Sequence, residues 1–217
     1  MRHDAGVDVR FCAGPPGMLT WIAAAPAFML RASHALVADG GVWLVDPVDG
    51  DGVRERVAAL GPPRAVLQLL DRHGRDCAAM AASLDVPLHR TPVDVIPGAP
   101  FDVVGVRSGR GWQESALWWP ARRALVVAEA LGTAPYFRAP GQRIGPHPFM
   151  RLFPPRSLVG FDAQHVLVGH GDPLHAPDAG RLADEAVARA RSSSPRWALA
   201  MVTGSVRRAS GRGVEPG

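Results

Sequence analysis

Residues 65–77 read AVLQLLDRHGRDC, and this stretch decides the fold class. Its first six residues are mostly apolar and predict a buried strand, and the polar residues 71–75 predict a loop. A helical pattern resumes at Asp76 and continues to Leu84. Strand, loop and helix in this order indicate an α/β protein.

A second strand–helix unit lies just upstream. Residues 42–46, VWLVD, follow the hairpin signal Asp39-Gly40-Gly41 and predict a short buried strand. Apolar residues at helical spacing predict a helix over 51–60, which Gly61-Pro62-Pro63 ends. Nearer the N-terminus, strands are predicted over residues 7–11, 18–24 and 28–38.

Strands dominate the rest of the chain. They are predicted over residues 86–89, 101–106, 114–119, 124–127 and 165–168. Residues 132–160 are rich in Pro, Gly and Arg, and we expect a functional loop or lid there. We expect a helix over 178–190 to close the fold. After Ser192-Ser193-Ser194-Pro195, residues 197–202 could form one more short element. We therefore expect one domain, residues 1–195, and an extension, 196–217, disordered from Arg207 on.

Composition excludes several classes of protein. The 217 residues are 47% hydrophobic and 20% charged, which is typical of a globular domain. No apolar run is long enough for a membrane span, and the N-terminus lacks a secretory signal, so we expect a cytoplasmic protein. Cys12 and Cys77 do not form a disulfide framework.

Basic residues are all arginine, because the sequence contains no lysine, and asparagine is also missing. This usage indicates a high-GC genome. The net charge of +4 is modest for the length, so we do not expect nucleic-acid binding. The chain carries neither a Gly-Lys-Ser/Thr phosphate loop nor a Gly-x-Ser-x-Gly nucleophile elbow.

Three segments together carry a family resemblance. They are the strand that ends at Asp46, the strand–loop–helix–strand of residues 65–89, and VLVGHGDP at 166–173, with residues 114–131 between the last two. Over about residues 7–190 the chain resembles the metallo-β-lactamase fold superfamily. The resemblance implies a four-layer αββα sandwich with a metal site at one edge of its two sheets.

The metal-binding signature of that family is largely replaced. It reads His-x-His-x-Asp-His, a turn in which imidazoles and a carboxylate converge on zinc. Aligned on Asp76, its three histidine positions hold Arg72, Gly74 and Cys77, and His73 stands one position out of register.

The family's later ligands are replaced in part. Its Gly-His segment corresponds to Gly109-Arg110, and its bridging aspartate corresponds to Glu129. His170, in Gly169-His170-Gly171, matches its family position. Arginine cannot serve as a metal ligand, so the resemblance implies a degenerate pocket rather than a two-metal site.

We therefore expect a pseudoenzyme with no metal, no cofactor and no catalytic residue. Its pocket would bind a small anionic molecule or a protein partner, with arginines and carboxylates paired in salt bridges. The pocket residues are Arg72, His73, Asp76, Arg110, Glu129 and His170. The alternative is a hydrolase of an ester, lactone or phosphoester, with one zinc, iron or manganese ion on Asp76, Glu129 and His170, with or without His73.

Other side chains have simpler interpretations. We expect His73 to be an exposed loop residue, His170 to hydrogen-bond to the backbone, and Cys77 to be a small core residue. His147 and His175 could reach the same edge of the fold, although their spacing does not require it. Of Trp118 and Trp119, one ring is expected in the core and the other outside.

Overall fold

Two β-sheets form the centre of the protein. The computed structural model describes residues 7–25 and 29–210, with side chains through residue 203. The first sheet has the order β1 (Val9–Cys12), β2 (Met18–Ala23), β3 (Ala32–Ala38), β4 (Gly41–Val45), β5 (Pro63–Gln68), β6 (Leu88–Arg90). The second has the order β13 (Leu174–His175), β12 (His165–Val168), β9 (Ala124–Val127), β8 (Trp112–Trp119), β7 (Asp102–Gly109).

Side-chain alternation along β4 determines what each face of the first sheet covers. Val42 and Leu44 belong to a core shared with α1 (Val53–Leu60) and α2 (Cys77–Leu84). Trp43 and Val45 point the other way, into the core between the two sheets. Every residue of β4 is buried because both faces of the strand are covered.

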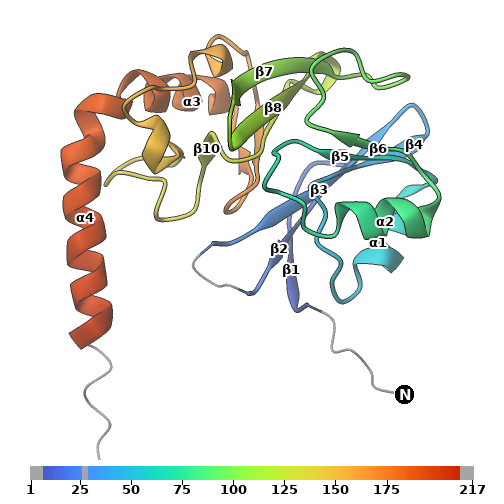
Figure 1. The fold of residues 1–217 in the computed structure, drawn as a ribbon, viewed down its shortest axis with the longest axis horizontal. Helices are drawn as coiled ribbons and strands as arrows, with labels where there is room; N and C mark the ends of the chain where they lie inside the picture. The colour runs from blue at the N-terminus through green and yellow to red at the C-terminus, as the bar shows by residue number, and fades with distance from the viewer. Residues whose placement is uncertain (1–6, 26–28, 211–217) are drawn as a thin grey trace, which may run out of the picture.

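The second sheet has its own helix on the outside. Ala183 and Val187 of α3 (Ala179–Ala188) join the same core as the buried strand β12. Figure 1 shows α1 and α2 on one side of the molecule and α3 on the other, with the sheets between them. The order helix, sheet, sheet, helix confirms the predicted four-layer αββα sandwich.

The segment 132–160 is more regular than its sequence predicts. It contains the short pair β10 (Leu131–Gly132) and β11 (Gly145–Pro146) and two 3₁₀ turns, Pro148–Met150 and Arg156–Leu158. Phe137, Met150 and Leu158 are buried. These apolar anchors order the segment, although they follow no helical or strand period in the sequence.

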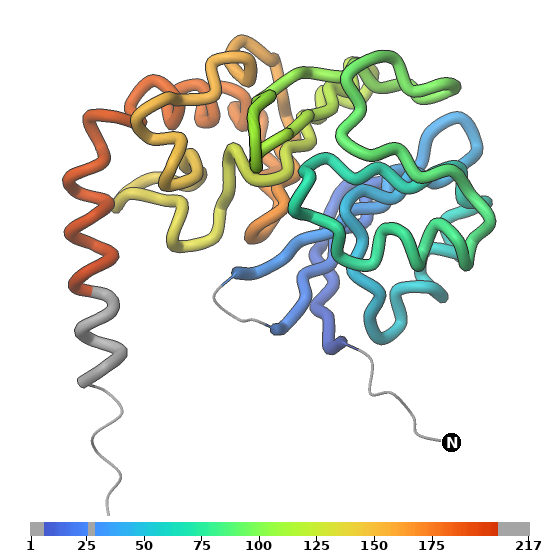
Figure 2. The backbone as a smooth tube through the Cα atoms, in the orientation of Figure 1, coloured from blue at the N-terminus to red at the C-terminus, as the bar shows by residue number. Residues whose placement is uncertain are grey.

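The C-terminal helix is longer than predicted. α4 (Ala190–Ser210) follows α3 directly and continues through Pro195, which lies between the two elements that the sequence predicts as separate. Figure 2 shows it leaving the end of α3 at the edge of the molecule. Trp197 donates to the Tyr136 carbonyl and stacks with Arg151, and these tertiary contacts offset the hydrogen bond that proline removes. Residues 211–217, part of the predicted disordered end, lie outside the described residues.

The parallel strands of each sheet place several loops at one edge of the sandwich. β4, β5 and β6 are parallel in the first sheet, and β9 and β12 are parallel in the second. Ligand sites in α/β folds form at the carboxyl ends of such strands.

Among the described residues, no helix is both long and apolar enough to cross a bilayer.

Candidate metal centre

Four polar side chains meet at this edge, each just beyond a parallel strand. Asp46 follows β4, His73 follows β5, Glu129 follows β9 and His170 follows β12. A cavity of about 220 Å³ opens beside them. It is lined by Met29, Arg31, Arg72, His73, Arg75, Glu129 and His170.

His73 is buried and only 6% exposed, so the prediction of an exposed loop residue is wrong. Its Nδ1 lies 2.9 Å from Oδ2 of Asp46, whose other oxygen accepts from the backbone N–H of Leu69. A carboxylate can only accept, so Nδ1 of His73 carries the proton and the lone pair of Nε2 points the other way. Asp46 has a φ of +44°, a conformation that aspartate tolerates better than most residues.

His170 is held in the same way by the backbone. Its Nδ1 donates to the carbonyl of Met29 at 2.8 Å, so the predicted backbone hydrogen bond is present. The free Nε2 lies 3.3 Å from Nε2 of His73. Glycine at position 169 permits this approach, because a Cβ there would lie 3.0 Å from Cε1 of His73 and 2.2 Å from the Ala128 carbonyl oxygen.

Glu129 brings a carboxylate to the two imidazoles. Its Oε1 lies 3.7 Å from Nε2 of His170, and its Oε2 accepts from Arg72 at 2.6 Å. The backbone N–H groups of Glu129 and Ala130 both donate to the buried carboxylate of Glu114. One ligand atom from each of His73, Glu129 and His170 falls within 4.8 Å of the others.

The protonation states leave two lone pairs facing each other. Burial lowers the pKa of His73, and burial together with His73 and Arg75 lowers that of His170 to about 3. Burial alone would raise the pKa of Asp46, but His73 and Arg75 outweigh it and hold this pKa below its ordinary value. Both imidazoles are therefore neutral near pH 7, and the gap between their nitrogens suits a cation.

The donor set fits one divalent ion. Donors bound at about 2.0–2.1 Å around a tetrahedral zinc are about 3.3 Å apart, close to the separation of the two Nε2 atoms. Two imidazoles and one carboxylate leave coordination positions open for water or substrate. Burial would also raise the pKa of the Glu129 carboxyl, but the hydrogen bond from Arg72 acts in the opposite direction and this pKa stays below its ordinary value, so the carboxylate is ionised.

A second ion lacks comparable donors among the described residues. Arg72 and Gly74 offer no ligand atom, and burial raises the pKa of the Cys77 thiol to about 12 while its Sγ contacts the His73 carbonyl. Asp76 accepts from the backbone N–H of Asp49 and does not line the cavity. Arg110 lies exposed in the turn between β7 and β8, also away from the cavity.

His147 is a member of this region whose role the sequence did not indicate. Its Nδ1 accepts from the backbone N–H of Phe149, so Nε2 carries the proton and points toward Oε1 of Glu129 at 3.7 Å. It is therefore placed as a donor and not as a metal ligand. His175 lies elsewhere and contacts His165.

Arginines surround the centre in two ways. The half-buried guanidinium of Arg75 donates to the carbonyls of Ala32, Asp46 and Gly169 and so ties the two sheets together. Arg72 is 43% exposed, pairs with Glu129 and lies 4.2 Å from the Trp112 ring. The sequence indicated Arg72 but not Arg75, because the targets of Arg75 are backbone atoms from three other segments.

The two tryptophans of β8 lie as their alternation predicts. Trp119 is buried in the core between the sheets, whereas Trp118 is partly buried and packs against Phe161.

Comparison with known proteins identifies the fold. No protein-family model and no curated protein sequence matches the chain. Among solved structures, the metallo-β-lactamase TMB-1 superposes with a TM-score of 0.57 at 9% identity, covering 84% of this chain and 98% of that one. DIM-1 metallo-β-lactamase gives 0.54 at 11% identity, over 86% and 100% of the two chains. A metallo-β-lactamase from Erythrobacter litoralis gives 0.53 at 14% identity, over 87% and 96%. The protein therefore has the metallo-β-lactamase fold that its sequence predicts.

Proposed function

We propose that this protein is a single-metal hydrolase that acts on a small anionic ester, lactone or phosphoester. The observation that carries the proposal is the convergence of two imidazole lone pairs and a carboxylate oxygen within 4.8 Å. His73 and His170 have their outer nitrogens fixed by Asp46 and the Met29 carbonyl, an arrangement typical of metal-binding histidines. This ligand set replaces the one with Asp76 that the sequence suggested.

Each part of the site has a role in this proposal. His73, His170 and Glu129 would hold the ion, which when bound would polarise the substrate and lower the pKa of a bound water. Arg72 holds the second oxygen of Glu129 and so orients the first toward the histidines. Nε2–H of His147 faces the same carboxylate from outside the cavity lining and would help to hold it in place.

The preference for an anion rests on the cavity mouth. Arg31 and Arg72 both line the cavity, and guanidinium groups match carboxylate and phosphate oxygens. The volume of about 220 Å³ favours a small substrate over a polymer.

Metal content tests the proposal directly. The full chain is dialysed against zinc, manganese or iron, and bound metal is measured by elemental analysis. We expect about one ion per chain, the stoichiometry of a single His₂-carboxylate site. His170→Ala should abolish both binding and turnover of a panel of esters, lactones and phosphoesters. His175→Ala, a histidine outside the centre, should change neither. Metal retained in the His170→Ala protein would contradict the ligand assignment.

A second candidate is the non-hydrolytic anion-binding protein. The ion pair between Arg72 and Glu129, together with arginines 31 and 75 around the cavity, favours it. This candidate predicts no bound metal after dialysis and a higher melting temperature with phosphate, a carboxylate or a nucleotide. A metal-free protein that no anion stabilises would contradict both candidates.

A further inference from the structure

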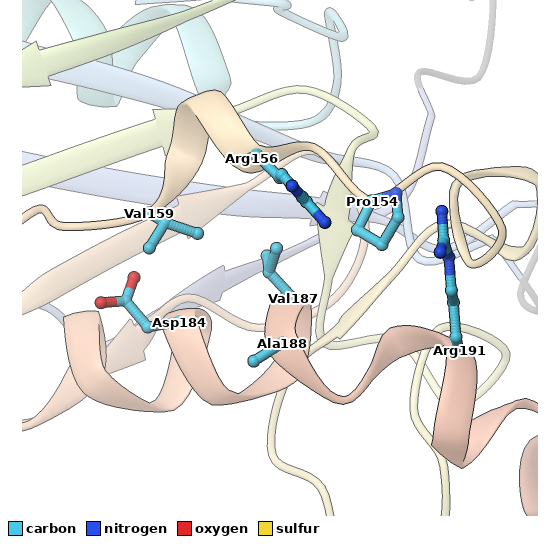
Figure 3. A pocket seen from close by; sticks show the side chains of 7 residues that line it. All are labelled: Pro154, Arg156, Val159, Asp184, Val187, Ala188 and Arg191. Atoms are coloured by element: carbon cyan, nitrogen blue, oxygen red, sulfur yellow. The ribbon is translucent and has the colours of Figure 1, made fainter.

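A larger cavity lies away from the metal centre and shares none of its lining residues. Its volume is about 470 Å³, within the range of small-molecule sites. Figure 3 shows it between helix α3, the start of α4 and the segment that contains the 3₁₀ turn at Arg156–Leu158. It is lined by Pro154, Arg156, Val159, Asp184, Val187, Ala188 and Arg191.

The walls of this cavity are mainly apolar. Val187 and Ala188 face it from α3, opposite Pro154 and Val159 (Figure 3). The apolar surface continues outside it, because Leu152 is 65% exposed and Phe153 is 71% exposed directly before Pro154. Large exposed apolar side chains that adjoin a cavity are typical of a binding site.

Two arginines lie at one end and one acid at the other. Among the described residues Arg156 has no hydrogen bond or ion pair from its side chain, and Arg191 uses its Nε for the Leu152 carbonyl but forms no ion pair. The carboxylate of Asp184 accepts from the backbone N–H of Gly160. In Figure 3 Arg156 and Arg191 lie beside Pro154, whereas Asp184 lies beside Val159 at the far end.

We propose that this cavity binds a free medium-chain aliphatic carboxylic acid. Its carboxylate would lie between the guanidinium groups of Arg156 and Arg191, whose planar donors match two carboxylate oxygens. Its alkyl chain would run along Val187 and Ala188 toward Val159. The charge of Asp184 repels an anion at that end and so sets the direction of the ligand.

Chain length and head group test this assignment. The full chain is titrated by calorimetry with hexanoate, octanoate and decanoate below their micelle concentrations. Affinity should rise by about fourfold per added methylene until the chain fills the cavity. Octanol should bind about tenfold more weakly than octanoate, because it lacks the charge-assisted hydrogen bonds. Octyltrimethylammonium should not bind. Equal affinity for octanol and octanoate would overturn the proposal.

Substitutions locate the site. Arg156→Gln removes a charge that supports no folded-state contact, and it should weaken octanoate binding by about tenfold. Ala188→Trp should fill the cavity and abolish binding, and Val159→Trp serves the same purpose should the first variant not fold. Arg181→Gln is the matched control, since Arg181 lies on α3 beside the cavity but does not line it and pairs with Asp178 and Glu185. It should leave the affinity within about twofold of wild type. Unchanged binding in Arg156→Gln would overturn the assignment.

Two other occupants would also contradict the proposal. One is a bilayer, indicated by binding to phosphatidylglycerol vesicles without binding of monomeric octanoate. The other is a second copy of the chain, indicated by a dimer in sedimentation experiments that Ala188→Trp disrupts and octanoate does not.

Discussion

The described part of the protein contains two close histidine pairs that differ in what surrounds them. His73 and His170 approach to 3.3 Å through Nε2, and His165 and His175 approach to 3.1 Å through Nδ1. In the first pair both outer nitrogens must donate, to Asp46 and to the Met29 carbonyl, so two lone pairs face each other. In the second pair neither outer nitrogen has a partner among the described residues, so one ring is free to donate to the other. Under the proposed function only the first pair can hold metal, because only there do fixed tautomers and a third ligand accompany the short contact.

Removing the third ligand should make the first pair resemble the second. Glu129→Gln keeps the side-chain size but removes the negative charge and replaces the carboxylate, a strong metal ligand, with an amide. We expect metal affinity to fall by more than the roughly 100-fold upper range seen for outer-shell changes, because a direct ligand is lost. Competition with a fluorescent zinc chelator measures the change. His165→Ala is the control, and equal losses in the two variants would contradict the difference between the pairs.

His34 adds a third case to the comparison of the two histidine pairs, because both of its ring nitrogens have hydrogen-bond partners within the protein. It contacts the Thr20 hydroxyl and the Val168 carbonyl, and burial lowers its pKa to about 4. Below pH 6.5 the unfolded chain binds a proton that the folded chain does not accept until about pH 4. The stability contributed by neutral His34 is therefore complete above pH 6.5 and is lost by roughly 3 kcal/mol as the pH falls to 4.

Denaturant unfolding at pH 7 and pH 4 measures this loss in the wild type and in His34→Gln. Glutamine preserves one donor and one acceptor but does not titrate in this range, so its pH dependence should be weaker. Identical pH dependence in the two proteins would show that His34 does not contribute.

The tautomer of His73 is the next point to test. Asp46→Asn keeps the shape, and asparagine tolerates the positive φ at this position. An amide N–H₂ facing Nδ1 would move the His73 proton to Nε2, which would then point into the site. Metal affinity should fall by about 10–100-fold, as for other outer-shell substitutions. The wild-type affinity in Asp46→Asn would mean that the tautomer does not control binding.

Substitution of Glu114, which supports the backbone of Glu129, should have the smallest effect of these changes. The Glu114 carboxylate accepts from the Glu129 and Ala130 N–H groups and from Nε1 of Trp112, and burial raises its pKa to about 7. In Glu114→Gln the amide would face the Trp112 N–H, so two donors would meet. We expect a loss of about 1–2 kcal/mol in the free energy of unfolding. Thermal and denaturant unfolding measure this loss, and a stabilised variant would contradict it.

Much of the fold could be predicted because local patterns of apolar residues determine most of its strands and helices. The strand over residues 165–168 follows from a short apolar run. The helix predicted over residues 51–60 follows from apolar residues at helical spacing and is observed as Val53–Leu60. The resemblance of residues 65–89 and 166–173 then placed these elements in one fold. The continuous helix α4 could not be predicted, because the local rule that proline ends a helix was outweighed at Pro195 by the hydrogen bond from Trp197 to the Tyr136 carbonyl, 61 residues away in the chain.

The candidate site, like the fold, was predicted from the sequence only in part. By itself the sequence determined that Glu129 and His170 follow strands at one edge and that arginine replaces several family ligands. Only the tertiary structure decided that His73 is buried, because its partners, Asp46 and His170, lie 27 and 97 residues away in the chain. It also decided that Asp76 and Arg110 lie outside the cavity. The physical reason is that a strand fixes side-chain direction with a period of two, whereas a loop side chain points toward whatever distant groups can bond to it.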